Sequence, residues 1–212
     1  MTAQTSPGLI HAVTDDDGIR TLIVDAVDRP MNVLSPELRV QMIAAVDAAL
    51  ADEAVRGLVL VSRRKEFIAG ADLTVLGSLR GKPVPEVRRF STPFRSMLRR
   101  MEQAGKPVVA AINGTALGGG FELCLACHHR IAADVPGALI GLPESQLGIL
   151  PGAGGTQRLP RLIGIAPSLP MVLEGRRLSP AQAFEAGLVD ALVPLAELEQ
   201  AAKAWILSGP EA

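Results

Sequence analysis

The chain opens with two apolar runs, at residues 9–13 and 19–26, on either side of the acidic turn DDDG at 15–18. Short apolar runs joined by a turn that ends in glycine are typical of a β-hairpin. The sequence therefore predicts paired strands near the N-terminus.

The spacing of apolar residues changes to that of a helix after Ser35. Ser35 suits a helix N-cap and Pro36 suits the first helical position. The following apolar residues recur at intervals of three and four: Leu38, Met42, Ala45, Val46 and Ala49. This pattern predicts an amphipathic helix.

A second amphipathic helix is predicted over residues 86–103, where arginines surround one apolar face. The apolar face consists of Val87, Phe90, Phe94, Met97, Leu98 and Met101. Pro93 lies inside this segment and is expected to bend the helix or to shift its start.

Continuous apolar runs at 56–62 and 107–112 are rich in β-branched residues, as in strands that are buried on both faces of a sheet. The long stretch between them favours parallel strands joined by crossover helices. After residue 155 the pattern predicts mainly helices, at 155–163, 167–174, 179–186 and 195–207, with an apolar stretch at 187–193. These elements predict an α/β fold.

Composition narrows the class of protein. The 212 residues are enough for one α/β domain with a substantial core, and 48% hydrophobic against 20% charged residues excludes a disordered chain. With 21 basic and 22 acidic residues, no overall field favours nucleic acid or an anionic membrane.

Two cysteines cannot form a disulfide framework, and the N-terminus lacks the features of a signal peptide. No apolar stretch approaches the roughly 20 residues that a membrane span needs. We therefore expect a soluble, cytoplasmic protein that binds neither nucleic acid nor membrane.

Three consecutive glycines, at 118–120, lie between the apolar run at 107–112 and a predicted helix. Glycines at a helix N-terminus leave backbone N–H groups uncovered, so that an anion or a developing oxyanion can approach them. The same glycines would also suit a tight strand-to-helix turn with no chemical role.

Two carboxylates are candidates for proton transfer. Glu122 lies in the first turn of the helix that follows the glycines, where the helix dipole favours its ionised form. Glu144 is flanked by Pro143 and apolar residues, and partial burial there is expected to raise its pKa. Glu122 would fit an ordinary surface carboxylate equally well, and neither residue alone establishes a catalytic role.

The segment FIAGADL at 67–73 follows the strand at 56–62 and offers a second set of backbone N–H groups at a strand end. Ligands gather at the carboxyl ends of strands in α/β sheets, so this segment is a candidate for the second donor of an oxyanion hole. An ordinary N-capped turn is the alternative.

Together these segments resemble the crotonase (enoyl-CoA hydratase/isomerase) superfamily. The resemblance rests on AGAD at 69–72, NGTALGGGFEL at 113–123, GLPESQLGILPGAGGTQRLPRLIG at 141–164 and GRRLSPAQAFEAGLVDALVP at 175–194. The sequence at 159–175 and 202–212 most resembles the N-terminal hydratase part of multifunctional fatty-acid oxidation proteins. The resemblance implies a ββα spiral fold with mostly parallel sheets and surrounding helices.

The resemblance implies hydration of a trans-2-enoyl-CoA to a 3-hydroxyacyl-CoA. It places the oxyanion-hole amides on Ala71 and Gly119 and the two acid-base carboxylates on Glu122 and Glu144. It also implies that Pro30, Met31, Ala69, Asp72 and Leu73 line the path of coenzyme A, and that Gly152 lies beside the bound water. Coenzyme A would be part of the substrate, and no separate cofactor or metal is expected.

The resemblance also implies a division of the chain, with a crotonase-like core at 1–194 and the start of a C-terminal helical region at 195–212. Such helices normally cover the acyl pocket, so the region looks truncated. A homo-oligomer (trimer or hexamer), or membership of a larger chain with a 3-hydroxyacyl-CoA dehydrogenase, would fit the family. A Δ3,Δ2-enoyl-CoA isomerase and a non-catalytic acyl-CoA-binding fragment are the alternative functions.

Other motifs give only weak evidence for a metal, redox or dinucleotide site. The CxxC spacing of Cys124 and Cys127 has no second ligand pair and favours core packing. His128 and His129 are placed at the end of the glycine-led helix, where a cation is stabilised by the helix dipole. The glycines at 152–155 do not form the GxGxxG motif of a dinucleotide site.

Overall fold

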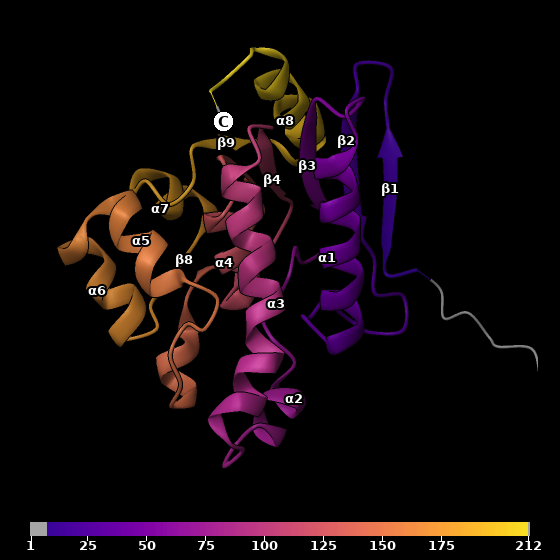
Figure 1. The fold of residues 1–212 in the computed structure, drawn as a ribbon. Coiled ribbons are helices and arrows are strands. Elements are labelled where there is room, and N and C mark those ends of the chain that lie inside the picture. The colour runs from indigo at the N-terminus through magenta and orange to yellow at the C-terminus, as the bar shows by residue number, and fades with distance from the viewer. Residues whose placement is uncertain (1–7, 212) are drawn as a thin grey trace, which may run out of the picture.

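A computed structural model describes residues 8–211 as a mixed α/β structure with two sheets (Figure 1). The larger sheet has the strand order β1-β2-β3-β4-β6-β9, and only the β1–β2 pair is antiparallel. Its strands are β1 (Ile10–Thr14), β2 (Ile19–Val24), β3 (Gly57–Ser62), β4 (Val108–Ile112), β6 (His129–Ala133) and β9 (Ala191–Val193). The predicted fold class, a mostly parallel sheet with surrounding helices, is confirmed.

The smaller sheet has three strands, β5 (Ala116–Leu117), β7 (Ile140–Gly141) and β8 (Arg177–Leu178). Strand β5 pairs parallel with β7, and β7 pairs antiparallel with β8. Strands of two residues carry no hydrophobic period, so the sequence pattern did not predict them.

The predicted hairpin and first helix are confirmed. Strands β1 and β2 pair around a turn in which Gly18 has a φ of 76°. Helix α1 (Pro36–Ala51) begins at the predicted cap, because the Ser35 side chain accepts a hydrogen bond from the Leu38 N–H at 3.2 Å. Cap and proline together fix where the helix starts.

Helix α3 (Val84–Gln103) runs without interruption through Pro93, so its start is not shifted by the proline. Pro93 removes the helical partner of the Arg89 carbonyl, and both residues are exposed. The buried residues of α3 are four of the six predicted for its apolar face: Phe94, Met97, Leu98 and Met101.

The strand β3 is buried on both faces because helices cover both sides of the large sheet. Leu58 and Leu60 belong to the core cluster that includes α1 and α3, whereas Val59 and Val61 belong to a second cluster. The second cluster is closed by helix α8 (Leu198–Leu207), through Leu198, Ala202 and Ile206. Helix α8 therefore shares a core with the sheet, although it belongs to the C-terminal region predicted at 195–212. The boundary between that region and the core at 1–194 stays a prediction.

Three further helices are grouped on one side of the molecule, away from β1 (Figure 1). They are α5 (Gly155–Ile163), α6 (Ile165–Leu173) and α7 (Pro180–Glu185), which agree with the predicted segments to within about two residues. Helix α2 (Leu73–Ser78) was not predicted. Helix α4 (Gly119–Leu125) ends before His128, and His129 begins strand β6, so these histidines do not lie in its last turn.

Candidate functional site

The short sheet brings the two candidate carboxylates together from positions 22 residues apart in sequence. Strand β5 leads directly into α4, which carries Glu122. Strand β7 leads into a 3-10 helix, η1 (Pro143–Leu147), which carries Glu144. Because β5 and β7 run parallel, with Leu117 opposite Gly141, the segments that follow both strands leave the sheet at the same end.

A third segment reaches this end of the small sheet. Ile68 forms a bridge with Ala116 at the start of β5, and Leu34 forms another with Ala71. Buried Asn32 holds this segment in place, donating to the Ser62 hydroxyl at 2.8 Å and to the Phe67 carbonyl at 3.1 Å. Asn32 was missed in the sequence, where nothing distinguishes it from a turn residue.

The glycines of α4 are required by close approaches. Gly118 has a φ of 51°, and a Cβ added there would lie 2.8 Å from Oε1 of Glu144. A Cβ on Gly120 would overlap the carbonyl oxygen of Ile68. The glycines therefore form a tight strand-to-helix turn, which was the alternative to an oxyanion site. They also let Glu144 approach the helix N-terminus.

The two predicted oxyanion donors, Ala71 and Gly119, line the same cavity as both glutamates. This cavity has a volume of about 210 Å³. Neither backbone N–H donates to any acceptor within residues 8–211. Free N–H groups at a helix N-terminus and a strand end are the donors that stabilise a developing oxyanion.

Glu122 is almost fully enclosed, with 2% of its surface exposed. Its Oε1 accepts hydrogen bonds from the N–H groups of Ala153 and Gly155, both at 2.7 Å. Burial raises the pKa of Glu122, and the two backbone hydrogen bonds and the charge of Arg158 oppose that rise. The two hydrogen bonds therefore hold the carboxylate in position and favour its ionised form against the larger opposite effect of burial.

Glu144 is 8% exposed and has a different environment. Burial, reinforced by the negative charge of Glu122, raises the pKa of Glu144 to about 7. Its Oε2 is buried and has no hydrogen-bond partner within residues 8–211. The raised pKa predicted for Glu144 is thus confirmed. Its causes are the predicted burial and the charge of Glu122, whose proximity could not be predicted from the sequence.

Arg158 supports the loop that holds Glu122. Its guanidinium donates to the Ala153 carbonyl at 2.8 Å and forms a bidentate ion pair with Glu102, with distances of 2.6 and 3.0 Å. Ala153 in turn donates to Glu122. Two charged residues behind the site therefore fix the loop that orients the carboxylate.

A second cavity, of about 370 Å³, adjoins the first and shares Ala71 and Glu144 with it. Four of the residues predicted for the coenzyme A path line it: Met31, Ala69, Asp72 and Leu73. Pro30 is not among its lining residues, whereas Gly152 lines the first cavity beside both glutamates. The Asp72 side chain also caps α2, accepting a hydrogen bond from the Thr74 N–H at 3.0 Å. The N-capped turn that was the alternative interpretation of residues 67–73 is therefore present as well.

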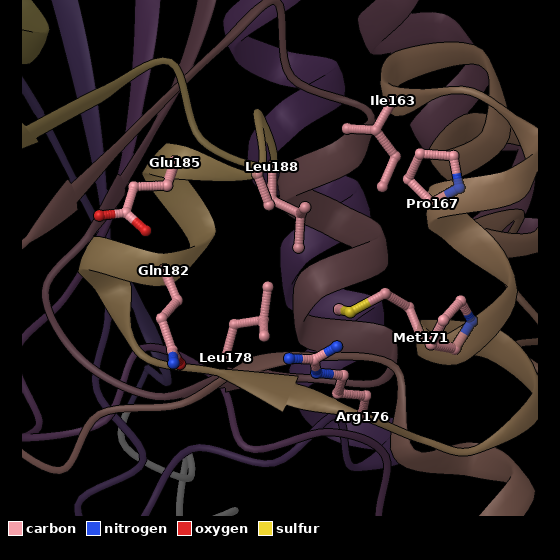
Figure 2. Close-up of a pocket in the computed structure, with 10 residues that line it drawn as sticks. Ile163, Pro167, Met171, Arg176, Leu178, Gln182, Glu185 and Leu188 are labelled. Carbon is pink, nitrogen blue, oxygen red and sulfur yellow. The ribbon is translucent and has the colours of Figure 1, made fainter.

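The cavity of about 480 Å³ in Figure 2 lies between α6 and α7 and contains none of the predicted site residues. Its polar residues are Arg176, Gln182 and Glu185, and Gln182 is engaged in the capping box of α7. No pair of carboxylates faces it, so the candidate site is the cavity with Glu122 and Glu144.

The CxxC cysteines are packed into the core, as predicted. Both are buried and free, and burial raises the pKa of the Cys127 thiol to about 12. Within residues 8–211 no three His, Cys, Asp or Glu side chains come together as a metal site. In the same part of the chain, none of the helices has the length and apolarity needed to cross a membrane.

Comparison with known proteins agrees with this geometry. The profile of the enoyl-CoA hydratase/isomerase family matches residues 20–208. The chain belongs to this family. Among curated relatives, it is 44% identical over 195 residues to the fatty acid oxidation complex subunit alpha of Shewanella loihica, covering 92% of this chain and 27% of the relative. It therefore spans about a quarter of the length of such relatives.

Solved structures of family members have the same fold. Enoyl-CoA hydratase from Bacillus anthracis superimposes with a TM-score of 0.84 at 37% identity, covering 94% of this chain and 76% of that structure. The protein from Geobacillus kaustophilus gives a TM-score of 0.86 at 30% identity, covering 96% and 75%. The crotonase-like fold and the likeness to the N-terminal part of fatty-acid oxidation proteins are confirmed by these comparisons.

Proposed function

We propose that this chain is an enoyl-CoA hydratase that adds water to trans-2-enoyl-CoA in β-oxidation. The observation that carries the proposal is that two buried glutamates with different environments face one cavity together with two free backbone N–H groups. Carboxylates whose surroundings push their pKa values apart are suited to act as base and acid in one reaction.

In the proposed reaction the thioester carbonyl accepts hydrogen bonds from the Ala71 and Gly119 N–H groups. Ionised Glu122 takes a proton from water as its oxygen bonds to C3, and the electrons of the C2–C3 double bond move toward the thioester oxygen. Protonated Glu144 then delivers a proton to C2, which returns the electrons from the oxygen and completes the 3-hydroxyacyl-CoA. Glu122 gives up the proton that it took from water and Glu144 regains one through solvent, so both groups return to their starting forms. Each preorganised donor is worth about 10²- to 10³-fold in rate.

Hydration is tested directly by the absorbance of crotonyl-CoA, which falls when water adds to the conjugated double bond. We expect a loss of absorbance that is proportional to enzyme concentration and formation of 3-hydroxybutyryl-CoA. A folded protein that leaves the absorbance unchanged would contradict the proposal. The predicted dehydrogenase partner, oligomeric state, cellular location and lack of a separate cofactor stay predictions.

The support of the Glu122 loop gives a further prediction. Replacing Arg158 by methionine removes the hydrogen bond to the Ala153 carbonyl and leaves Glu102 without its bidentate partner. We expect kcat for hydration to fall about 10-fold or more with little change in KM, because a slightly misplaced catalytic group costs rate rather than binding.

The attractive charge of Arg158 also holds the pKa of Glu122 down. The acid limb of the pH–rate profile should therefore move to higher pH in Arg158→Met and return toward its original position in Arg158→Lys. A uniform loss of activity with an unchanged pH profile would indicate that Arg158 acts only through folding.

A further inference from the structure

Two arginines interrupt the apolar wall of the cavity that contains Glu122 and Glu144. Arg39 comes from α1 and Arg95 from α3, and both line this cavity. Apart from Ser91 and the two glutamates, the rest of its wall is apolar, formed mainly by Leu34, Leu76, Leu79, Phe90, Phe94 and Ile149. Guanidinium groups are out of place in a pocket that accepts only a hydrocarbon chain.

The Arg39 side chain is fixed in position. Its guanidinium carbon lies 3.9 Å from the centre of the Phe90 ring and 5.3 Å from that of Phe94. One nitrogen, Nη2, donates to the Phe90 carbonyl at 2.6 Å. A guanidinium has five N–H groups, and the others on Arg39 have no acceptor within residues 8–211. Stacking and one hydrogen bond therefore orient the Arg39 guanidinium and leave its other N–H groups free to bind a ligand.

Within residues 8–211, no carboxylate forms an ion pair with either arginine, Arg39 or Arg95. The only carboxylates that line the cavity are Glu122 and Glu144. Burial lowers the pKa of the Arg39 guanidinium. An anion placed against Arg39 would compensate for that burial.

Building on the proposed function, we propose that the substrate is a 2-enoyl-CoA with a carboxylate at the far end of its acyl chain. Arg39 is the specificity-determining residue and binds that carboxylate. An alkyl end of the same length would have to remove water from Arg39 without replacing its hydrogen bonds, whereas a carboxylate would replace them.

A phosphate of coenzyme A is a different source of negative charge. The predicted coenzyme A path runs through the second cavity, along Met31, Ala69 and Leu73. Neither Arg39 nor Arg95 lines that cavity, whereas both line the one that contains the glutamates. The acyl end is therefore the part of the substrate assigned to Arg39.

The test compares hydration of trans-2-hexenedioyl-CoA and trans-2-hexenoyl-CoA by the unaltered chain and by Arg39→Leu. We expect the unaltered chain to have the higher kcat/KM for the diacid derivative. In Arg39→Leu that value should fall by about 10- to 100-fold, the fold-change of one or two charged hydrogen bonds. The value for hexenoyl-CoA should stay the same or rise. Arg89→Leu, on the exposed side of α3, is the matched control and should change neither.

Binding measured without turnover separates this inference from the proposed function. Calorimetry with the saturated analogues adipyl-CoA and hexanoyl-CoA should show tighter binding of adipyl-CoA, and the difference should vanish in Arg39→Leu. If that preference is present but neither enoyl-CoA is hydrated, the proposed hydratase function fails and the carboxylate site stands.

Three results would overturn the carboxylate site. The first is equal binding of adipyl-CoA and hexanoyl-CoA by the unaltered chain. The second is an equal loss of activity with both enoyl-CoA substrates in Arg39→Leu, which would indicate a structural role. The third is weaker binding of free coenzyme A to that variant, which would assign Arg39 to a phosphate.

Discussion

Replacing Glu144 by glutamine is expected to slow hydration of crotonyl-CoA by about 10²- to 10⁴-fold, the usual contribution of a positioned acid-base group. Glutamine keeps the shape of the side chain but cannot donate the proton that C2 needs. Circular dichroism should show an intact fold. Glu86→Gln, which changes an exposed glutamate on α3, is the matched control and should retain full activity. Near-normal turnover by Glu144→Gln would remove Glu144 from the mechanism.

The same variant should lose a distinctive pH dependence. With the pKa of Glu144 at about 7, hydration by the unaltered enzyme should fall as pH rises through that value, because Glu144 must begin protonated. Dehydration of 3-hydroxybutyryl-CoA, measured as kcat/KM, should fall over the same range, because the overall reaction releases no proton and both directions therefore use the same singly protonated pair of glutamates. A limb that is common to the two directions and absent in Glu144→Gln would identify Glu144 as the group that exchanges the C2 proton.

The buried acid is also expected to lower the stability of the fold above neutral pH. The pKa of Glu144 is higher in the folded chain than its ordinary value of 4.5, so the folded state binds more protons between those two values. Its free energy of unfolding should therefore decrease as pH rises from about 4.5 to about 7.

Glu144→Gln removes this titration. Urea denaturation should show the variant to be more stable than the unaltered chain at pH ~8, by on the order of 1–2 kcal/mol after allowance for solvent screening. At pH ~4, where Glu144 is neutral in both states, the difference should be close to zero. Equal stabilities at both pH values would mean that the carboxylate is well solvated.

Replacing Glu122 by glutamine is expected to slow hydration by about 10²- to 10⁴-fold while sparing a reaction that uses no water. The glutamine carbonyl can still accept hydrogen bonds from Ala153 and Gly155, so the loop should keep its position. What is lost is the negative charge that activates water. Isomerisation of a 3-enoyl-CoA needs a single acid-base carboxylate and should survive in Glu122→Gln but not in Glu144→Gln.

Measurement of both reactions in both variants therefore distinguishes a hydratase from an isomerase. Glu199→Gln on α8 changes an exposed carboxylate and serves as the control. Equal loss of both reactions in Glu122→Gln, with unchanged stability, would show that Glu122 shares in the proton transfer. Unimpaired hydration would exclude it as the residue that activates water.

The elements with a long hydrophobic period could be predicted from the sequence because their pattern reflects local geometry. Helix α1 was predicted together with its Ser35 cap, and β3 was recognised as a strand buried on both faces. Strands β5 and β7 have only two residues each and exist through pairing with one another, which no local pattern encodes. Helix α2 is a single short segment without a buried residue, so it left no apolar signal.

For the site, sequence motifs identified Glu122, Glu144, Ala71 and Gly119 through resemblance to a family, and burial of Glu144 was predicted from its apolar neighbours. Tertiary structure alone placed these residues around one cavity, raised the pKa of Glu144 through the charge of Glu122, and brought Arg39 from α1 to the wall. The physical reason is that a helix or strand pattern depends on contacts a few residues apart. A cavity and its electrostatics depend on segments that meet only when the β5–β7 pair and the helices around it have packed.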